Sequence, residues 1–287
     1  MGMTVKSSHA FAFKANIPGL FKFQRYSDAE SKERVHKALT KGELHFASPD
    51  QFNDPFEGRP RIEAKLSKAE FQSGAAKEVS RFGKKMKISL GKRLEAIEHV
   101  KRKNPAQTLA HAREQHWKRL RTECRIYCAS ANREHPLLWS HYADSHRGIC
   151  LHMDHKTASF ASALPIDYQD DYPTISYDFD DAGERGRHVF QKSVLTKAKY
   201  WAYENEYRMV SIRMGNASWD LGLKWTVEKD KAYVDPKAIT GITVGASMPK
   251  EIRDSLAAFC RTERPDIQLE FAKISDNEYQ LLFELGA

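Results

Sequence analysis

The chain has 287 residues, 41% of them hydrophobic, and carries a formal net charge of +8 at pH 7. No apolar run approaches the roughly 18 to 20 residues of a membrane span, and the first residues lack the apolar centre of a signal peptide; we therefore expect a cytoplasmic protein with no membrane partner. Its four cysteines show no C-x-x-C spacing, which excludes a secreted disulfide scaffold and argues against a zinc knuckle, so we expect them to be reduced.

The first elements are marked by short-range signals. An apolar segment over 20–26, rich in aromatic residues, predicts a strand. Ser27 and Glu30 have the spacing of a capping box that opens a helix, and Gly42 is placed to end it. Residues 43–47 then predict a second strand.

A basic helical insertion is predicted at 62–123, after a loop over 48–58 that is dense in turn formers. Ser67 and Glu70 form a second capping box, and Asn104-Pro105 supplies a cap and a proline at the start of a last helix. We expect two or three helices here, inserted between strands.

The positive charge of the chain is concentrated in this insertion. From Lys65 to Arg121 there are 16 Lys plus Arg against 5 Asp plus Glu, a charge of +11, whereas the remainder carries −3. A like-charged surface repels itself, and a polyanionic partner such as nucleic acid would relieve that repulsion. The alternatives are a solvated helical face, an oligomer contact, or packing against the acidic stretch Asp167 to Asp181.

The remaining pattern mixes strands with helices without regular alternation, and no glycine-rich phosphate loop follows a strand. We therefore predict an α+β fold, a single domain over 1–287 with a mixed or split β-sheet, peripheral helices and the basic helical insertion. The later predicted strands are 125–130, 147–153, 206–212, 239–244 and 267–271, and the later helices 137–142 and 249–261.

Two carboxylates stand at the start of the predicted strand 206–212. On this strand Glu204 and Glu206 point to one face and Asn205 to the other. Two adjacent carboxylates repel, so one has its pKa raised or finds a cation. The alternative is a pair of solvated edge charges balanced by Arg208 and Lys199.

Several motifs in order resemble a bacterial family catalogued as domain of unknown function 2971. The resemblance spans Leu20 to about Gly245, is interrupted by the basic insertion, and implies no settled activity. The motifs are Leu20-Phe-Lys-Phe, Asn53-Asp-Pro-Phe-Glu57, Leu138-Trp-Ser-His-Tyr142 with Gly148, and Lys197 followed by Trp201-x-Tyr-Glu204-x-Glu206-x-Arg208.

A second resemblance, to ADP-ribosyltransferases of the Arg, Ser, Glu type, implies NAD held in the cleft of a split sheet. Arg25, Ser130 and the pair Glu204 and Glu206 occur in the required order. The resemblance implies that Arg25 grips the pyrophosphate, that Ser130 bonds a ribose or steadies a glutamate, and that Glu206 stabilises the oxocarbenium-like sugar. Glu204 is then expected on the acceptor side, and Lys22 or Tyr26 is the alternative to Arg25 on the first strand.

The candidate site combines both resemblances. We expect the Asn53 to Glu57 loop and the Trp139 to Tyr142 helix to lie close to Glu206, because polar groups on separate segments make sense if they converge on one cleft. The expected catalytic residues are Glu206, Glu204 and His141; the expected cofactor-binding residues are Lys22, Arg25, Tyr26, Asn53, Asp54, Ser130, Trp139 and Tyr142.

The expected function is that of an NAD-dependent ADP-ribosyltransferase-like bacterial effector, of the toxin or phage-defence type, acting on nucleic acid or an associated protein. One alternative is a non-catalytic nucleic-acid-binding or adaptor module of a defence system. Another is a metal-dependent nuclease in which Asn53, Asp54 and Glu57 bind a metal with Glu206.

Overall fold

The computed structural model describes residues 12, 15–64, 66–176, 191–214, 217–221 and 229–286. The chain divides into two compact units, each assembled from separate stretches of sequence. Unit 1 contains Met1–Gln51, Glu123–Tyr168 and Lys199–Ala287; unit 2 contains Phe52–Thr122 and Gln169–Ala198.

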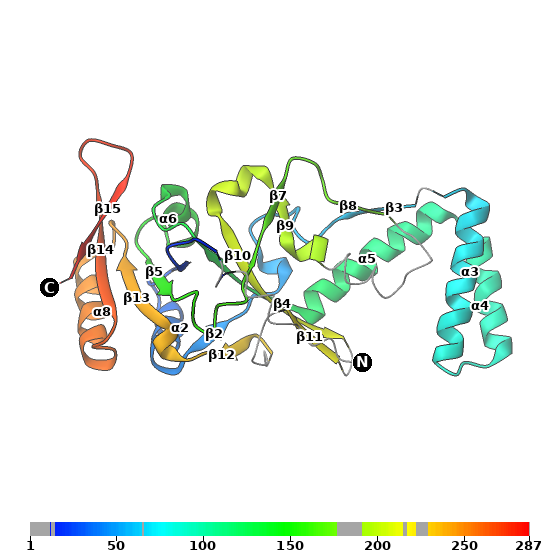
Figure 1. Ribbon diagram of the computed structural model, residues 1–287, viewed down its shortest axis with the longest axis horizontal. Helices are drawn as coiled ribbons and strands as arrows, with labels where there is room; N and C mark the ends of the chain where they lie inside the picture. Colours follow the sequence, from blue (N-terminus) through cyan, green and yellow to red (C-terminus); the bar gives the residue numbers. More distant parts are fainter. Residues whose placement is uncertain are drawn as a thin grey trace. The chain divides into compact units, whose positions relative to one another are not determined.

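Unit 1 is an α+β structure built on one mixed sheet, as predicted (Figure 1). Its strands are β1 (Leu20–Gln24), β2 (Glu43–His45), β4 (Cys124–Ser130), β5 (Ile149–Met153), β6 (Leu164–Pro165), β10 (Glu206–Met214), β11 (Ala217–Leu221), β12 (Lys231–Tyr233), β13 (Ile239–Val244), β14 (Gln268–Ile274) and β15 (Leu281–Leu285). Its helices are α2 (Ala29–Lys41), α6 (Pro136–Tyr142) and α8 (Lys250–Glu263), with 3₁₀ helices η2 (Pro49–Gln51), η3 (Lys199–Glu204) and η4 (Pro236–Ala238). Strand β7 (Asp167–Gln169) lies where the chain passes from unit 1 to unit 2.

Among the described residues the main sheet has nine strands, in the order β11-β10-β4-β1-β5-β13-β14-β15, with β6 also pairing with β10. Strands β13 and β14 run parallel, whereas the other neighbours in this order are antiparallel. Parallel and antiparallel pairs in one sheet make it mixed, which confirms that prediction.

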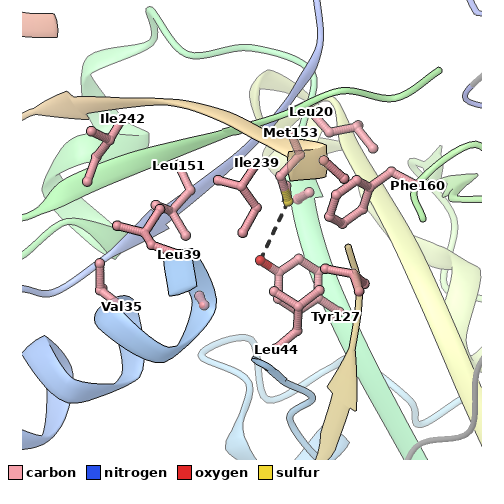
Figure 2. Close-up of a cluster of buried hydrophobic side chains, with 14 of the residues drawn as sticks. Leu20, Val35, Leu39, Leu44, Tyr127, Leu151, Met153, Phe160, Ile239 and Ile242 are labelled. Carbon is pink, nitrogen blue, oxygen red and sulfur yellow. Dashed lines mark hydrogen bonds between the residues drawn. The ribbon is translucent and has the colours of Figure 1, made fainter. Parts of the chain in front are cut away.

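One face of this sheet carries the larger core. Apolar side chains of alternate residues on β1, β4, β5 and β13 pack against Val35 and Leu39 of α2 and against Leu256 of α8. Figure 2 shows this cluster, in which the Tyr127 hydroxyl donates a hydrogen bond to Met153 Sδ at 3.6 Å. The polar tip of a buried tyrosine is thereby satisfied inside an apolar layer.

Helix α6 covers the opposite face. Phe21 and Phe23 of β1 point to this side, and the Phe23 ring meets Trp139 edge to face at 5.1 Å. Trp139 is fully buried, and its Nε1 donates to the carbonyl of Arg133 at 2.8 Å. The short helix is therefore anchored to the sheet through one tryptophan.

The sheet is nearly split between β4 and β1. In the described register these strands are joined only at Phe21 and Ser130, whereas β1 follows β5 over its whole length. Where β1 and β4 separate, Lys22 Nζ donates to the carbonyl of Cys128 at 2.8 Å, so a side chain replaces the missing ladder partner. The sheet thus consists of two parts that meet at Ser130.

Helix α2 begins one residue later than predicted. Its N-cap is Asp28, whose carboxylate accepts from the Ser31 amide at 2.7 Å, while Ser31 Oγ lies 3.2 Å from the Asp28 amide nitrogen. The capping box is therefore Asp28 with Ser31, not Ser27 with Glu30, because Asp28 is an equally good cap one position along. Gly42 ends the helix with φ of 65°, as predicted.

Unit 2 contains the predicted helical insertion, which consists of three helices. Its helices are α3 (Lys68–Lys85), α4 (Leu90–Arg102) and α5 (Pro105–Glu123), whose last residue is counted in unit 1; its strands are β3 (Arg61–Glu63), β8 (Thr174–Ser176) and β9 (Thr196–Ala198). Helices α3 and α4 lie side by side as a hairpin (Figure 1), and β3 pairs with β8 in parallel. The predicted caps are confirmed, because Ser67 and Glu70 form a capping box and Asn104 Oδ1 accepts from the Ala106 amide at 3.0 Å.

Candidate functional site

The segment from Glu204 to Glu206 is a turn, so the prediction that both glutamates lie on one strand is wrong. Glu204 ends η3, and Asn205 has φ of 43°, in the left-handed region that asparagine tolerates better than most residues. Strand β10 begins only at Glu206. The alternation of side chains between the two faces of a strand therefore does not apply to Glu204. The direction of its side chain is determined by the end of η3.

Glu206 is paired with Arg208 inside the protein. Two hydrogen bonds join them, Arg208 Nε to Glu206 Oε1 at 2.7 Å and Arg208 Nη2 to Oε2 at 3.0 Å. The side chain of Glu206 is 6% exposed and that of Arg208 is 2% exposed. The alternative of solvated edge charges is therefore wrong in that the charges are buried, but right in that Arg208 balances Glu206. A fork-to-fork pair of this kind neutralises the carboxylate and fixes its orientation.

Glu204 has a different environment. The Tyr142 hydroxyl of α6 donates to Glu204 Oε1 at 2.6 Å, and Ser130 Oγ donates to the main-chain carbonyl of Glu204. In the register of β4 and β10, Ser130 stands opposite Glu206. The structure therefore brings together four predicted site residues from three segments that are far apart in sequence.

Rings of histidine, tyrosine and tryptophan surround the place where Glu204, Ser130 and Tyr142 meet, which we call the glutamate corner. The exposed His141 ring lies 6.1 Å from Trp201 and 6.2 Å from Tyr142, and His135 stacks on Tyr203 at 4.7 Å. Trp139, by contrast, is a core side chain whose ring nitrogen is already bonded to a carbonyl. Among the predicted site residues of α6, Tyr142 and His141 therefore lie at the glutamate corner, whereas Trp139 does not.

The three alternatives on the first strand have distinct positions. Lys22 lies at the split in the sheet, where burial lowers its pKa and the negative charges of Glu206 and Glu204 oppose that shift. Arg25 is largely exposed and lies 3.9 Å from an Asp28 carboxylate oxygen. Burial raises the pKa of Tyr26 to about 12, and its hydroxyl lies 2.7 Å from Nε2 of the half-buried His36.

The loop with Asn53 and Asp54 belongs to unit 2. Asp54 Oδ1 accepts from the Phe56 amide at 2.9 Å, the turn-capping use that an Asn-Asp-Pro sequence favours. Glu57 pairs with Lys197 at 3.1 Å, and both side chains are only 3% exposed. Because the two units are described separately, the expected proximity of this loop to Glu206 stays a prediction.

One buried polar network was not predicted from the sequence. Thr243 Oγ1 donates to Glu270 Oε2 at 3.2 Å and lies 2.6 Å from His152 Nε2, while Arg133 and Gln268 also donate to the Glu270 carboxylate. Burial lowers the pKa of His152 to about 4. Polar residues at inward positions of otherwise apolar strands are the signal that could have found it.

Other site types have less support among the described residues. No group of three or more His, Cys, Asp or Glu side chains in this part of the chain is arranged to hold a metal ion. No described helix is long and apolar enough to cross a membrane. The four cysteines are free, and burial raises the pKa of Cys124 to about 12 and that of Cys260 to about 11.

The α3–α4 hairpin forms a basic surface. Eight exposed cationic side chains of the hairpin and the residue after it have no hydrogen-bond or ion-pair partner within the described part of the chain, namely Lys68, Lys77 and six more, whereas Arg81 and Lys101 pair with Glu78 and Glu98. Helix α4 has no buried residue at all. The six, which we call the basic hairpin surface, are Lys84, Lys85, Lys87, Lys92, Arg102 and Lys103.

Comparison with known proteins gives one match. No curated protein and no solved structure matches the chain. The resemblance to ADP-ribosyltransferases therefore stays a prediction. Residues 138–209, from α6 into β10, match the model of the family described as Protein of unknown function (DUF2971), which confirms the first resemblance over that segment.

Proposed function

We propose that this protein binds nucleic acid through the basic hairpin surface. The observation that supports the proposal is that these six cations are exposed and unpartnered within the described residues. Glu78 and Glu98 on the same helices pair with Arg81 and Lys101, so they leave the charge of the six in place. Phosphates would relieve the repulsion between the like charges and release counterions on binding.

The binding is largely independent of sequence. Long lysine side chains on a helical hairpin contact phosphates, which position a protein on nucleic acid but carry no base information. Nothing in the insertion has the pattern of a base-reading motif. Duplex DNA and RNA should therefore compete within an order of magnitude of each other.

A salt titration tests the proposal. If all six cations contact phosphates of duplex DNA, log K should fall with log salt with a slope of about −5, at about −0.9 per phosphate. The triple variant K84E/K85E/K87E should bind at least tenfold more weakly and lower the slope by about 3.

The matched control is K156E/K237E/R261E, which changes the net charge equally at exposed positions of unit 1. It should retain most of the affinity. Equal weakening by both variants would show that net charge alone matters, and absence of binding by the native protein at low salt would refute the proposal.

A second candidate, ADP-ribosyltransferase-like glycosyl transfer with NAD as the donor, is favoured by the convergence of Ser130, Glu204, Tyr142 and Lys22 where the sheet is nearly split. Of the two glutamates, we assign Glu204 to the sugar cation, because the charge of Glu206 is already neutralised by Arg208.

The cation available at the split for a pyrophosphate is Lys22, while Arg25 is directed to solvent and Asp28. The Ser130 hydroxyl is engaged with the Glu204 carbonyl, so its role is to position Glu204. The acceptor in this proposal is nucleic acid or an associated protein, as for a bacterial toxin or phage-defence effector.

Nicotinamide release from NAD, with and without nucleic acid, tests this candidate. Glu204→Gln should abolish release while the protein stays folded, and Tyr142→Phe should reduce it because Glu204 loses one positioning hydrogen bond. Mass spectra of protein and nucleic acid would identify the modified species. Release by the native protein no faster than in buffer, or unchanged release by Glu204→Gln, would exclude the candidate.

A further inference from the structure

Strand β15 forms one edge of the main sheet of unit 1 (Figure 1, near the C mark). Among the described residues no strand pairs with its outer side. Its sequence, Leu-Leu-Phe-Glu-Leu, contains none of the lysines or prolines with which sheet edges are usually protected against pairing.

Two hydrogen bonds establish which backbone groups of β15 point outward. The Gly286 amide donates to the carbonyl of Leu269 at 2.8 Å, and the Ser275 amide donates to the carbonyl of Gln280 at 3.1 Å. Bonded and non-bonded pairs alternate along an antiparallel ladder. The even-numbered residues of β15 are therefore bonded to β14, and the amides and carbonyls of Leu281, Phe283 and Leu285 point away from the sheet.

The edge also exposes apolar side chains. Leu285 is 71% exposed, Ile274 on the neighbouring β14 is 69% exposed, and Leu282 is 46% exposed. The one charged residue of the strand, Glu284, is paired with Lys273 of β14 in its own chain. An approaching strand would thus meet apolar surface and compensated charge.

We propose that this edge pairs with the same edge of a second copy of the chain, antiparallel and centred on Phe283. In this register Phe283 faces Phe283 of the second copy, and Leu281 faces Leu285 of the second copy. Every outward backbone group of the five-residue strand then has a partner, which gives about six hydrogen bonds across the two-fold axis.

Side chains fit the same register. Leu285 lies beside Leu281 of the second copy, and Ile274 of the second copy follows in the same row, because Ile274 and Leu281 are neighbours in the sheet. Glu284 faces Leu282 of the second copy, so no like charges are opposed. If the pairing shifts by two residues in one direction, Glu284 lies opposite Glu284 of the second copy, and the like charges repel. If it shifts by two residues in the other direction, only three residues of β15 pair, so hydrogen bonds are lost.

The contact is small, so the dimer is weak and depends on concentration. An interface of one edge strand lies below the roughly 1,200 Å² of a standard stable interface, and we expect a Kd on the order of micromolar or weaker. Sedimentation velocity of the full chain over a wide concentration range should show reversible conversion of monomer to dimer.

Three substitutions at one exposed position test the register. Leu282→Glu would place a carboxylate beside Lys273 in its own chain but opposite Glu284 of the second copy, so it should weaken the dimer at least tenfold without unfolding the protein. Leu282→Lys would place an ammonium group beside Lys273 in its own chain and opposite Glu284 of the second copy. It should therefore weaken the dimer less than Leu282→Gln, which supplies no charge. An identical effect of all three would refute the register.

Hydrogen exchange provides a second readout that does not depend on variants. The amides of Leu281, Phe283 and Leu285 should be protected only at concentrations at which the dimer forms, whereas those of Leu282 and Glu284 should be protected at all concentrations. A native protein that stays monomeric at the highest attainable concentration, or edge amides whose protection does not change with concentration, would overturn the proposal. Pairing with a strand of a different protein would leave the purified chain monomeric and would have the same consequence.

Discussion

The buried pair of Glu206 and Arg208 makes a quantitative prediction about stability. Glu206→Gln keeps the shape of the side chain but removes the charge that compensates a fully buried guanidinium. Breaking a buried ion pair from one side costs about 3–5 kcal/mol, and one remaining amide oxygen can still accept a hydrogen bond, so we expect about 3 kcal/mol. In a chain of this size that loss lowers Tm by about 6–12 °C.

A double-mutant cycle measured by urea unfolding tests this estimate. Arg208→Met alone should destabilise the protein comparably, whereas E206Q/R208M should lose much less than the sum, with a coupling energy of about 2 kcal/mol or more. Glu30→Gln, which breaks the exposed pair with Arg34 at 2.9 Å, is the control and should stay close to the native stability. A Glu206→Gln protein as stable as this control would refute the buried geometry.

Three further predictions follow from local environments. Burial lowers the pKa of both His116 and His152 to about 4, so below about pH 6.5 these histidines take up protons in the unfolded chain but not in the folded chain. The free energy of unfolding should therefore fall by at most about 3 kcal/mol per histidine between pH 6.5 and 4. In a plot of Tm against pH, His116→Gln or His152→Gln should flatten that part of the curve. Because burial raises the pKa of Cys124 to about 12 and that of Cys260 to about 11, their thiols should react with a disulfide reagent far more slowly in the native protein than in urea, and equal rates would contradict their burial. Gly42→Ala should destabilise unit 1 by more than 1 kcal/mol in thermal unfolding, because φ is 65° and an added Cβ would lie 1.9 Å from a backbone oxygen; an unchanged Tm would contradict that cap.

Local signals predicted the ends of most elements well. The caps at Ser67 and Asn104 and the stop at Gly42 depend on residues within one helical turn, so the sequence contains all the information they need. The start of α2 was misplaced by one residue because Ser27 and Asp28 are both good caps, and the choice between them depends on the side chain of Ser31.

The candidate site depended on longer-range contacts. The hydrogen bond from Tyr142 to Glu204 joins residues 62 positions apart, and Lys22 reaches a carbonyl 106 positions away. Periodicity alone predicts Glu204 and Glu206 on one face of a strand, because it contains no information about the left-handed backbone conformation of Asn205 between them. The importance of the order of the motifs could be recognised from sequence, whereas the partner of each side chain could not.

The division of the chain into interleaved segments has a consequence for synthesis on the ribosome. Unit 2 has all its residues once Ala198 is made, but β4 of unit 1 must wait for β10, whose first residue follows Ser130 by 76 positions. At roughly 5–20 residues per second the apolar edge of β4 stays open for about 4 to 15 s in the nascent chain. That interval is long enough for aggregation or chaperone capture, so the yield of folded protein should depend on translation speed across residues 131–206.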